Sequence, residues 1–130
     1  MATAISALVT GGLIYGYVQS SIQSEWSCYS LAAQSLAQQR MEETRSAAWD
    51  PTAFPPLDQL LGSNFPVTTN VMDIPLTGTN TIYCTNTTTI TDISTTPRLR
   101  CVRVDCTWKF MSRPNIYTNT VVTYRCPDTY

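Results

Sequence analysis

Residues 1–24 contain no charged side chain, and this feature constrains the fold of the chain more than any other. At about 1.5 Å per residue, a helix of this length reaches roughly 36 Å, slightly more than the ~30 Å hydrocarbon layer of a membrane. Threonine, serine, glutamine and glycine interrupt the apolar residues, so the segment is less hydrophobic than a dedicated membrane helix. A cleavable signal peptide begins with a basic region, whereas the first basic residue here is Arg40. The segment therefore predicts a helix that is buried against lipid or against other helices.

The same helix is expected to continue as an amphipathic segment to Asp50, because Pro51 disfavours helical backbone in the residue before it. Apolar residues recur in this segment with the three-and-four spacing of one helical face, which predicts that this face packs on a sheet. The division expected is an apolar half-helix at 1–24, an amphipathic half-helix at 25–50 and a β domain at 51–130. The residues expected to join helix and sheet are Ile22, Trp26, Tyr29, Ala33, Leu36 and Met41.

The remainder of the chain is rich in threonine and in β-branched and aromatic residues, which favour strands. A short helical turn is expected at 58–62. Strands are expected near 67–74, 81–93, 99–110 and 117–126, with turns at 78–80, 94–97 and 112–115. The predicted fold is α+β: a long N-terminal helix packed on a small antiparallel sheet.

Strict alternation of apolar and polar residues in the third expected strand predicts one buried face and one solvent-exposed face. Val102, Val104, Cys106, Trp108 and Phe110 alternate there with charged residues and threonine. Two registers are open for the fourth strand. Val102 opposite Cys126 would turn Val122 and Tyr124 inward, whereas Cys101 opposite Cys126 would turn them toward solvent.

Composition argues against an enzyme and against a nucleic-acid-binding protein. The chain has 130 residues, a net charge of -1 and no histidine, which removes the commonest general base and metal ligand. Its eight basic residues are interspersed with acids and form no patch. No calcium-loop spacing is present, and no cofactor or metal is expected.

Five cysteines suggest disulfides in an exported domain, because their spacing lacks the paired motifs of zinc sites. Cys28, the one cysteine on the helix, is expected to be the cysteine left without a disulfide partner in the chain. Cys101 with Cys126 is one candidate bridge, and Cys84 with Cys101 or Cys106 is its rival. Asn86-Thr87-Thr88 matches the N-glycosylation sequon, although a threonine-rich exposed strand explains this stretch more simply. Gly12 and Gly16 form a GxxxG motif, which allows close helix packing.

The opening MATAISALVTGGLIYGY, together with SLAAQSLAQQRMEETRSAAWD at 30–50, resembles the N-terminal helix of bacterial type IV pilin-like proteins, a family that includes the type II secretion pseudopilins. LRCVRVDCTWKF followed by YTNTVVTYRCPD resembles the closing hairpin of some of these proteins. By this resemblance Met1 falls a few residues inside the processed helix, and we expect the leader and its processing site to lie upstream.

The resemblance implies a structural filament subunit that waits in the inner membrane and is then assembled, by pilus or type II secretion machinery, with copies of itself. The filament would be extracellular, or periplasmic for a pseudopilin. A minor pseudopilin and a single-pass membrane-anchored binding module are the alternatives. The residues expected to line the filament core are Ile5, Leu8, Val9, Gly12, Leu13, Ile14, Gly16, Tyr17 and Val18.

Overall fold

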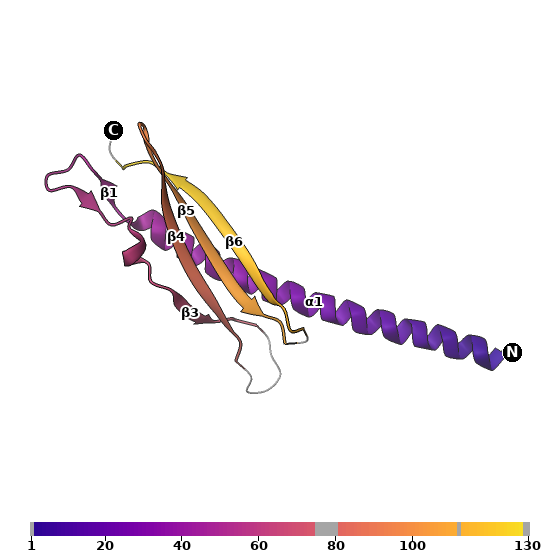
Figure 1. The fold of residues 1–130 in the computed structure, drawn as a ribbon. Coiled ribbons are helices and arrows are strands. Elements are labelled where there is room, and N and C mark those ends of the chain that lie inside the picture. Colours follow the sequence, from indigo (N-terminus) through magenta and orange to yellow (C-terminus); the bar gives the residue numbers. More distant parts are fainter. Residues whose placement is uncertain (1, 75–80, 112, 129–130) are drawn as a thin grey trace.

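The computed structural model describes residues 2–74, 81–111 and 113–128, with the backbone alone for residues 2–5. One long helix, α1 (Ala2–Ser46), runs across a four-stranded antiparallel sheet and projects beyond it (Figure 1). The sheet consists of β3 (Thr68–Val71), β4 (Tyr83–Thr95), β5 (Arg98–Lys109) and β6 (Ile116–Arg125), in that spatial order. The predicted α+β architecture is confirmed.

The long strands β4 and β5 form a hairpin through the expected turn near 94–97. Cys84 lies opposite Trp108, and the register shifts between Asp92 and Ser94. Every second residue of each strand faces α1, so the threonines at odd positions of β4 lie on the outer face. The turn expected at 78–80 lies outside the described residues, as does part of the one expected at 112–115.

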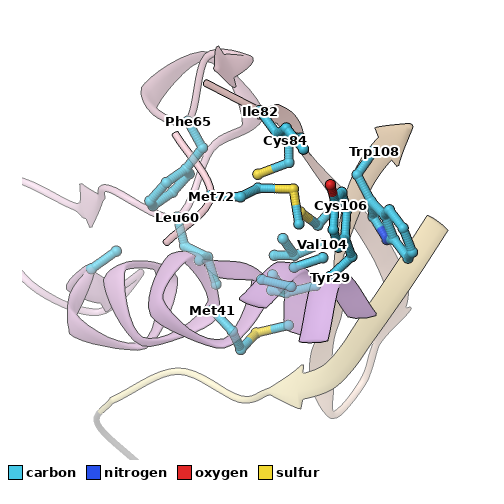
Figure 2. Packing of buried hydrophobic residues seen from close by; sticks show 14 of the residues in the cluster. Tyr29, Met41, Leu60, Phe65, Met72, Ile82, Cys84, Val104, Cys106 and Trp108 are labelled. Atoms are coloured by element: carbon cyan, nitrogen blue, oxygen red, sulfur yellow. The ribbon is translucent and has the colours of Figure 1, made fainter. Parts of the chain in front are cut away.

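The hydrophobic core lies between the second half of α1 and the inner face of the sheet (Figure 2). The predicted alternation in β5 is confirmed, because its inward residues are fully buried while Arg103 and Lys109 are exposed. Ala33 and Ala37 are also fully buried, and their short side chains let the helix lie close to the sheet. The buried core residues are Tyr29, Ala33, Ala37, Met41, Ala47, Trp49, Leu60, Phe65, Met72, Ile82, Cys84, Val102, Val104, Cys106, Trp108 and Phe110.

The register between β5 and β6 differs from both registers considered from the sequence. Val102 lies opposite Thr123, and Cys101 lies opposite Tyr124. Val122 and Tyr124 are therefore on the outer face, where both are exposed. The inner positions of β6 are taken instead by Tyr117, Asn119, Val121, Thr123 and Arg125.

The helix ends at Ser46, and the prediction that it reaches Asp50 is wrong. Carbonyl groups at the end of a helix lack partners within it, and here the Arg125 guanidinium donates to the carbonyls of Thr44, Arg45 and Ala47 at 3.0, 2.8 and 3.3 Å. The Trp49 N–H then donates to Asp128 at 2.7 Å. These contacts come from the last strand and the segment after it, so the local sequence does not reveal them.

The helical turn expected at 58–62 is also wrong. Leu57–Asp58 is a short strand, β2, which pairs with β1 (Trp49–Asp50) in a separate two-stranded ribbon. A 3-10 turn, η1, follows at Gly62–Asn64. Pairing with Trp49 holds residue 58 in extended conformation, and tertiary contact thus overrides local helix preference.

Arg100 of β5 joins this ribbon to the main sheet. Its guanidinium makes a two-pronged ion pair with Asp58 at 2.7 and 2.8 Å, and it donates to the Leu60 carbonyl at 2.8 Å. Its Nε donates to Asp92 at 2.7 Å, and the group lies 4.4 Å from the centre of the Trp49 ring. Hydrogen bonds from these carboxylates raise the pKa of Arg100 against the opposing effect of burial, so the group stays charged.

Candidate assembly surface on the N-terminal helix

The first half of α1 extends away from the sheet (Figure 1). It carries a set of exposed apolar side chains. Leu8, Leu13 and Tyr17 are 78%, 71% and 78% exposed. We call residues 6–21 of the projecting helix the free half-helix, because every side chain in this range is exposed. Val9, Ile14, Tyr15 and Val18 are the other large apolar residues on it.

These apolar residues surround the helix. At about 100° per residue, Leu8 and Tyr17 lie on opposite faces, and Val9 and Val18 are likewise opposed. A helix that is apolar on one face packs on one neighbour, but a helix that is apolar all round is buried on all sides. The free half-helix therefore presents an apolar surface to every side.

The polar side chain of Thr10 on this segment is compatible with a dry environment. The Thr10 hydroxyl donates to the Ser6 carbonyl one turn earlier at 2.8 Å, so this donor needs no water. Hydroxyl groups bonded in this way add little cost when a helix enters an apolar surrounding.

The glycines create a narrow strip on the free half-helix. A Cβ atom built at Gly12 or at Gly16 meets nothing within 4 Å. Neither glycine is needed for packing within the monomer, and each costs helix stability by about 1 kcal/mol relative to alanine. Their open surroundings leave space for a second backbone to approach.

Aromatic rings fix the helix to the sheet immediately after the free half-helix. Trp26 contacts Trp108 and Tyr117, with ring centres 6.1 and 6.0 Å apart, and Trp108 stacks on Tyr117 at 4.9 Å. Tyr29 meets Phe110 edge to face at 5.1 Å. Burial, reinforced by the Glu25 charge, raises the pKa of Tyr29, so this phenol is neutral in the core.

Polar contacts set the position of the helix along the sheet. The Trp108 indole donates to the Asn119 Oδ1 at 2.7 Å, and the Asn119 amide donates to Ser30 Oγ and Gln34 Oε1 at 3.2 and 3.3 Å. Farther along the helix, Arg40 donates to the Pro66 carbonyl at 2.7 Å. Such directional bonds oppose sliding or rotation of α1, which apolar contacts alone permit.

A hollow of about 260 Å³ marks the point where α1 leaves the sheet. Arg113 from the loop between β5 and β6 lies on one side, and helix residues lie on the other. The lining side chains are Gln19, Ile22, Gln23, Trp26, Arg113 and Tyr117. The hollow is continuous with the free half-helix, so the candidate surface includes both.

The residues predicted from the helical spacing lie on one side of α1, against the sheet. Tyr29, Ala33 and Met41 belong to the buried core, and Ile22, Trp26 and Leu36 pack against it. The residues predicted for a filament core lie on the free half-helix, except that the Ile5 side chain is outside the described part of the structure.

Asn86 and the cysteines have different surroundings. Asn86 is 2% exposed and faces the helix, a placement that argues against a glycan on this amide. No two cysteines are bonded to each other among the residues that the structure describes; Cys84 and Cys106 are buried, and Cys28 and Cys126 are exposed. Cys101 is partly exposed on the outer face.

Sequence reasoning missed the anchoring roles of Asn119 and Arg125. Both occupy inward positions of β6, where a polar residue is unusual and signals a specific partner. Only the correct register shows that these positions face inward.

No helix in the described part of the chain is long and apolar enough to count as a membrane-crossing segment. Comparisons with protein-family models, with curated proteins and with solved structures give no match. The molecule is a long N-terminal helix packed on an antiparallel sheet, an arrangement consistent with a pilin-like fold.

Proposed function

We propose that this chain is a structural subunit of a type IV pilus-like filament, extracellular or periplasmic, which assembles through its N-terminal helix. One observation carries the proposal: the free half-helix has apolar side chains on all sides, and every one of them is exposed in the monomer. Burying seven large side chains of this kind gives a strong driving force at ~25 cal/mol per Å² of apolar surface. Parallel copies packed side by side would cover every face of each helix.

The partners in this proposal are copies of the chain, the assembly machinery of a pilus or type II secretion system, and the inner membrane before assembly. The free half-helix is only moderately apolar, which suits a transfer from the membrane into a filament. In that transfer, contacts among copies of the chain replace contacts with lipid. The threonine-rich outer face of the sheet would form the filament surface.

Substitution of the glycine strip tests the proposal. Gly12→Leu and Gly16→Leu add side chains where the monomer has open space, so the β domain stays folded and the helix is strengthened. We expect both variants to lose filaments in electron micrographs of cells that produce the full-length protein, including any leader. Gly62→Leu is the matched control, because its Cβ also meets nothing within 4 Å but lies outside α1.

Normal filaments from both helix variants would refute the proposed contacts. A monomer in detergent, with no fibres from the unmodified protein, would instead favour the membrane-anchored binding module. Mass spectrometry of sheared filaments then separates a major subunit, which dominates the sample, from a minor pseudopilin.

A further inference from the structure

Two cysteine side chains meet inside the core, apart from the other three. Cys84 on β4 and Cys106 on β5 occupy diagonal positions on neighbouring strands, since Cys84 pairs with Trp108 and Cys106 with Asn86. Both face α1 and are 1% and 0% exposed. Figure 2 shows them in the same buried cluster as Met72.

The two thiols lie within hydrogen-bonding reach of each other. The Cys106 thiol hydrogen-bonds to the Cys84 sulfur, which also accepts the backbone N–H of Asn70 on β3. A disulfide requires that the two sulfurs can approach each other to about 2.05 Å. Cys101 and Cys126, the pair first suggested by spacing, are also offset by two residues, but they lie on the outer face of the sheet, where Cys101 is partly exposed and Cys126 is exposed.

We propose that Cys84 and Cys106 form a disulfide that links β4 to β5 within the core. The inference rests on the proposed function for its compartment, because a filament subunit folds outside the reducing cytoplasm. The bond would fix the central hairpin of the sheet and leave Cys28, Cys101 and Cys126 available for other contacts.

The reaction is a thiol–disulfide exchange in which a small-molecule or protein disulfide is the oxidant. The Cys84 thiolate attacks one sulfur of the oxidant and releases the other as a thiolate, which takes up a proton. The Cys106 thiolate then attacks the Cys84 sulfur and releases the second oxidant thiolate. Two thiols lose two protons and two electrons in total, and the oxidant is reduced to two thiols.

Local electrostatics favours this order of events. The hydrogen bond from Cys106 lowers the pKa of Cys84 despite burial, whereas its bond to Cys84 and its own burial raise the pKa of Cys106. Access to the pair requires local opening, and β3 beside Cys84 is a short edge strand of four residues.

The test uses the full-length chain in mild detergent, incubated with an excess of oxidised over reduced glutathione, then alkylated and digested with trypsin without reduction. Lys or Arg residues separate each cysteine from the next, so the five cysteines fall in different tryptic peptides. We expect a cross-linked pair of the peptides that contain Cys84 and Cys106. Alkylation of both, or linkage of either to another cysteine, overturns the inference.

Thermal unfolding provides a second measurement. Closing a loop of ~20 residues should raise Tm by on the order of 10 °C, and reduction should remove this increment. Cys84→Ala with Cys106→Ala should abolish the redox-dependent shift, whereas the matched pair Cys101→Ala with Cys126→Ala should keep it. Loss of the shift in the control pair alone would also overturn the inference.

These measurements do not require filaments. A missing cross-link therefore refutes the disulfide alone, and failed assembly of the oxidised protein refutes the proposed function alone.

Discussion

Replacement of Arg100 by methionine should remove the contacts that hold the β1–β2 ribbon against the main sheet. Methionine keeps much of the apolar stem but removes the charge and every hydrogen bond. The Arg100 side chain is 12% exposed, and its partner Asp58 is 32% exposed, so this ion pair is only partly screened by solvent. Asp92 is 72% exposed and adds little.

The expected loss follows from these contacts. The two-pronged pair with Asp58 should contribute about 1–2 kcal/mol, below the 3–5 kcal/mol of fully buried pairs. The unsatisfied Leu60 carbonyl adds about 1 kcal/mol, and the lost contact with the buried Trp49 ring adds about 1 kcal/mol. Unfolding should therefore become easier by about 3 kcal/mol, or on the order of 10–20 °C in Tm.

The assay is urea and thermal unfolding of the full chain in detergent, followed by near-ultraviolet circular dichroism and by tryptophan fluorescence. Trp49 lies directly against Arg100 and reports on the ribbon. Arg98→Met is the control, because Arg98 is exposed in the same hairpin, and it should change stability by less than about 0.5 kcal/mol. Equal stability of the Arg100 variant and the wild type, or an equal loss in the control, would refute the reasoning.

Two further predictions concern the core. Leu60→Ala should cost about 2–5 kcal/mol in urea unfolding because Leu60 is fully buried, whereas Leu61→Ala, at a partly exposed neighbour, should cost far less; similar losses would contradict the packing described. Burial and the Glu25 charge raise the pKa of Tyr29 in the folded state. The contribution of the neutral phenol to folding stability is therefore complete below the unfolded pKa of about 10, and it is lost as the pH rises through the higher folded pKa. Tyr29→Phe should flatten this alkaline decline, and Tyr17→Phe, at an exposed position, should not; identical pH profiles of stability for Tyr29→Phe and the wild type would show that the phenol is not the cause.

Periodic burial made much of the fold predictable. The spacing of apolar residues from Ile22 to Met41 and the alternation from Val102 to Phe110 both reflect one-sided contact between helix and sheet, which leaves a direct trace in the sequence. The apolar start of the chain likewise identified the candidate assembly surface before any packing was known.

Features set by distant partners were not predictable. At the helix end near Ser46, Arg125 donates to the last carbonyls. The β1–β2 ribbon is held extended by its pairing and by the bonds of Arg100 to Asp58. The β5–β6 register depends on Asn119 and Tyr117 meeting Trp108 on the inner face. Each of these choices balances a local preference against a contact that is remote in sequence, so a local pattern predicts the wrong result.

The contacts between Arg125, Asp128 and the helix end also have a consequence for biosynthesis. α1 leaves the ribosome before the sheet, and the strand face that covers it and the side chains that contact its C-terminal end are translated last. The sheet-facing side of α1 and the free half-helix therefore stay uncovered for most of the synthesis of the chain. Unfinished chains with exposed apolar surfaces of this kind tend to aggregate. Early delivery to a membrane or a chaperone would shield both surfaces until the final strand arrives.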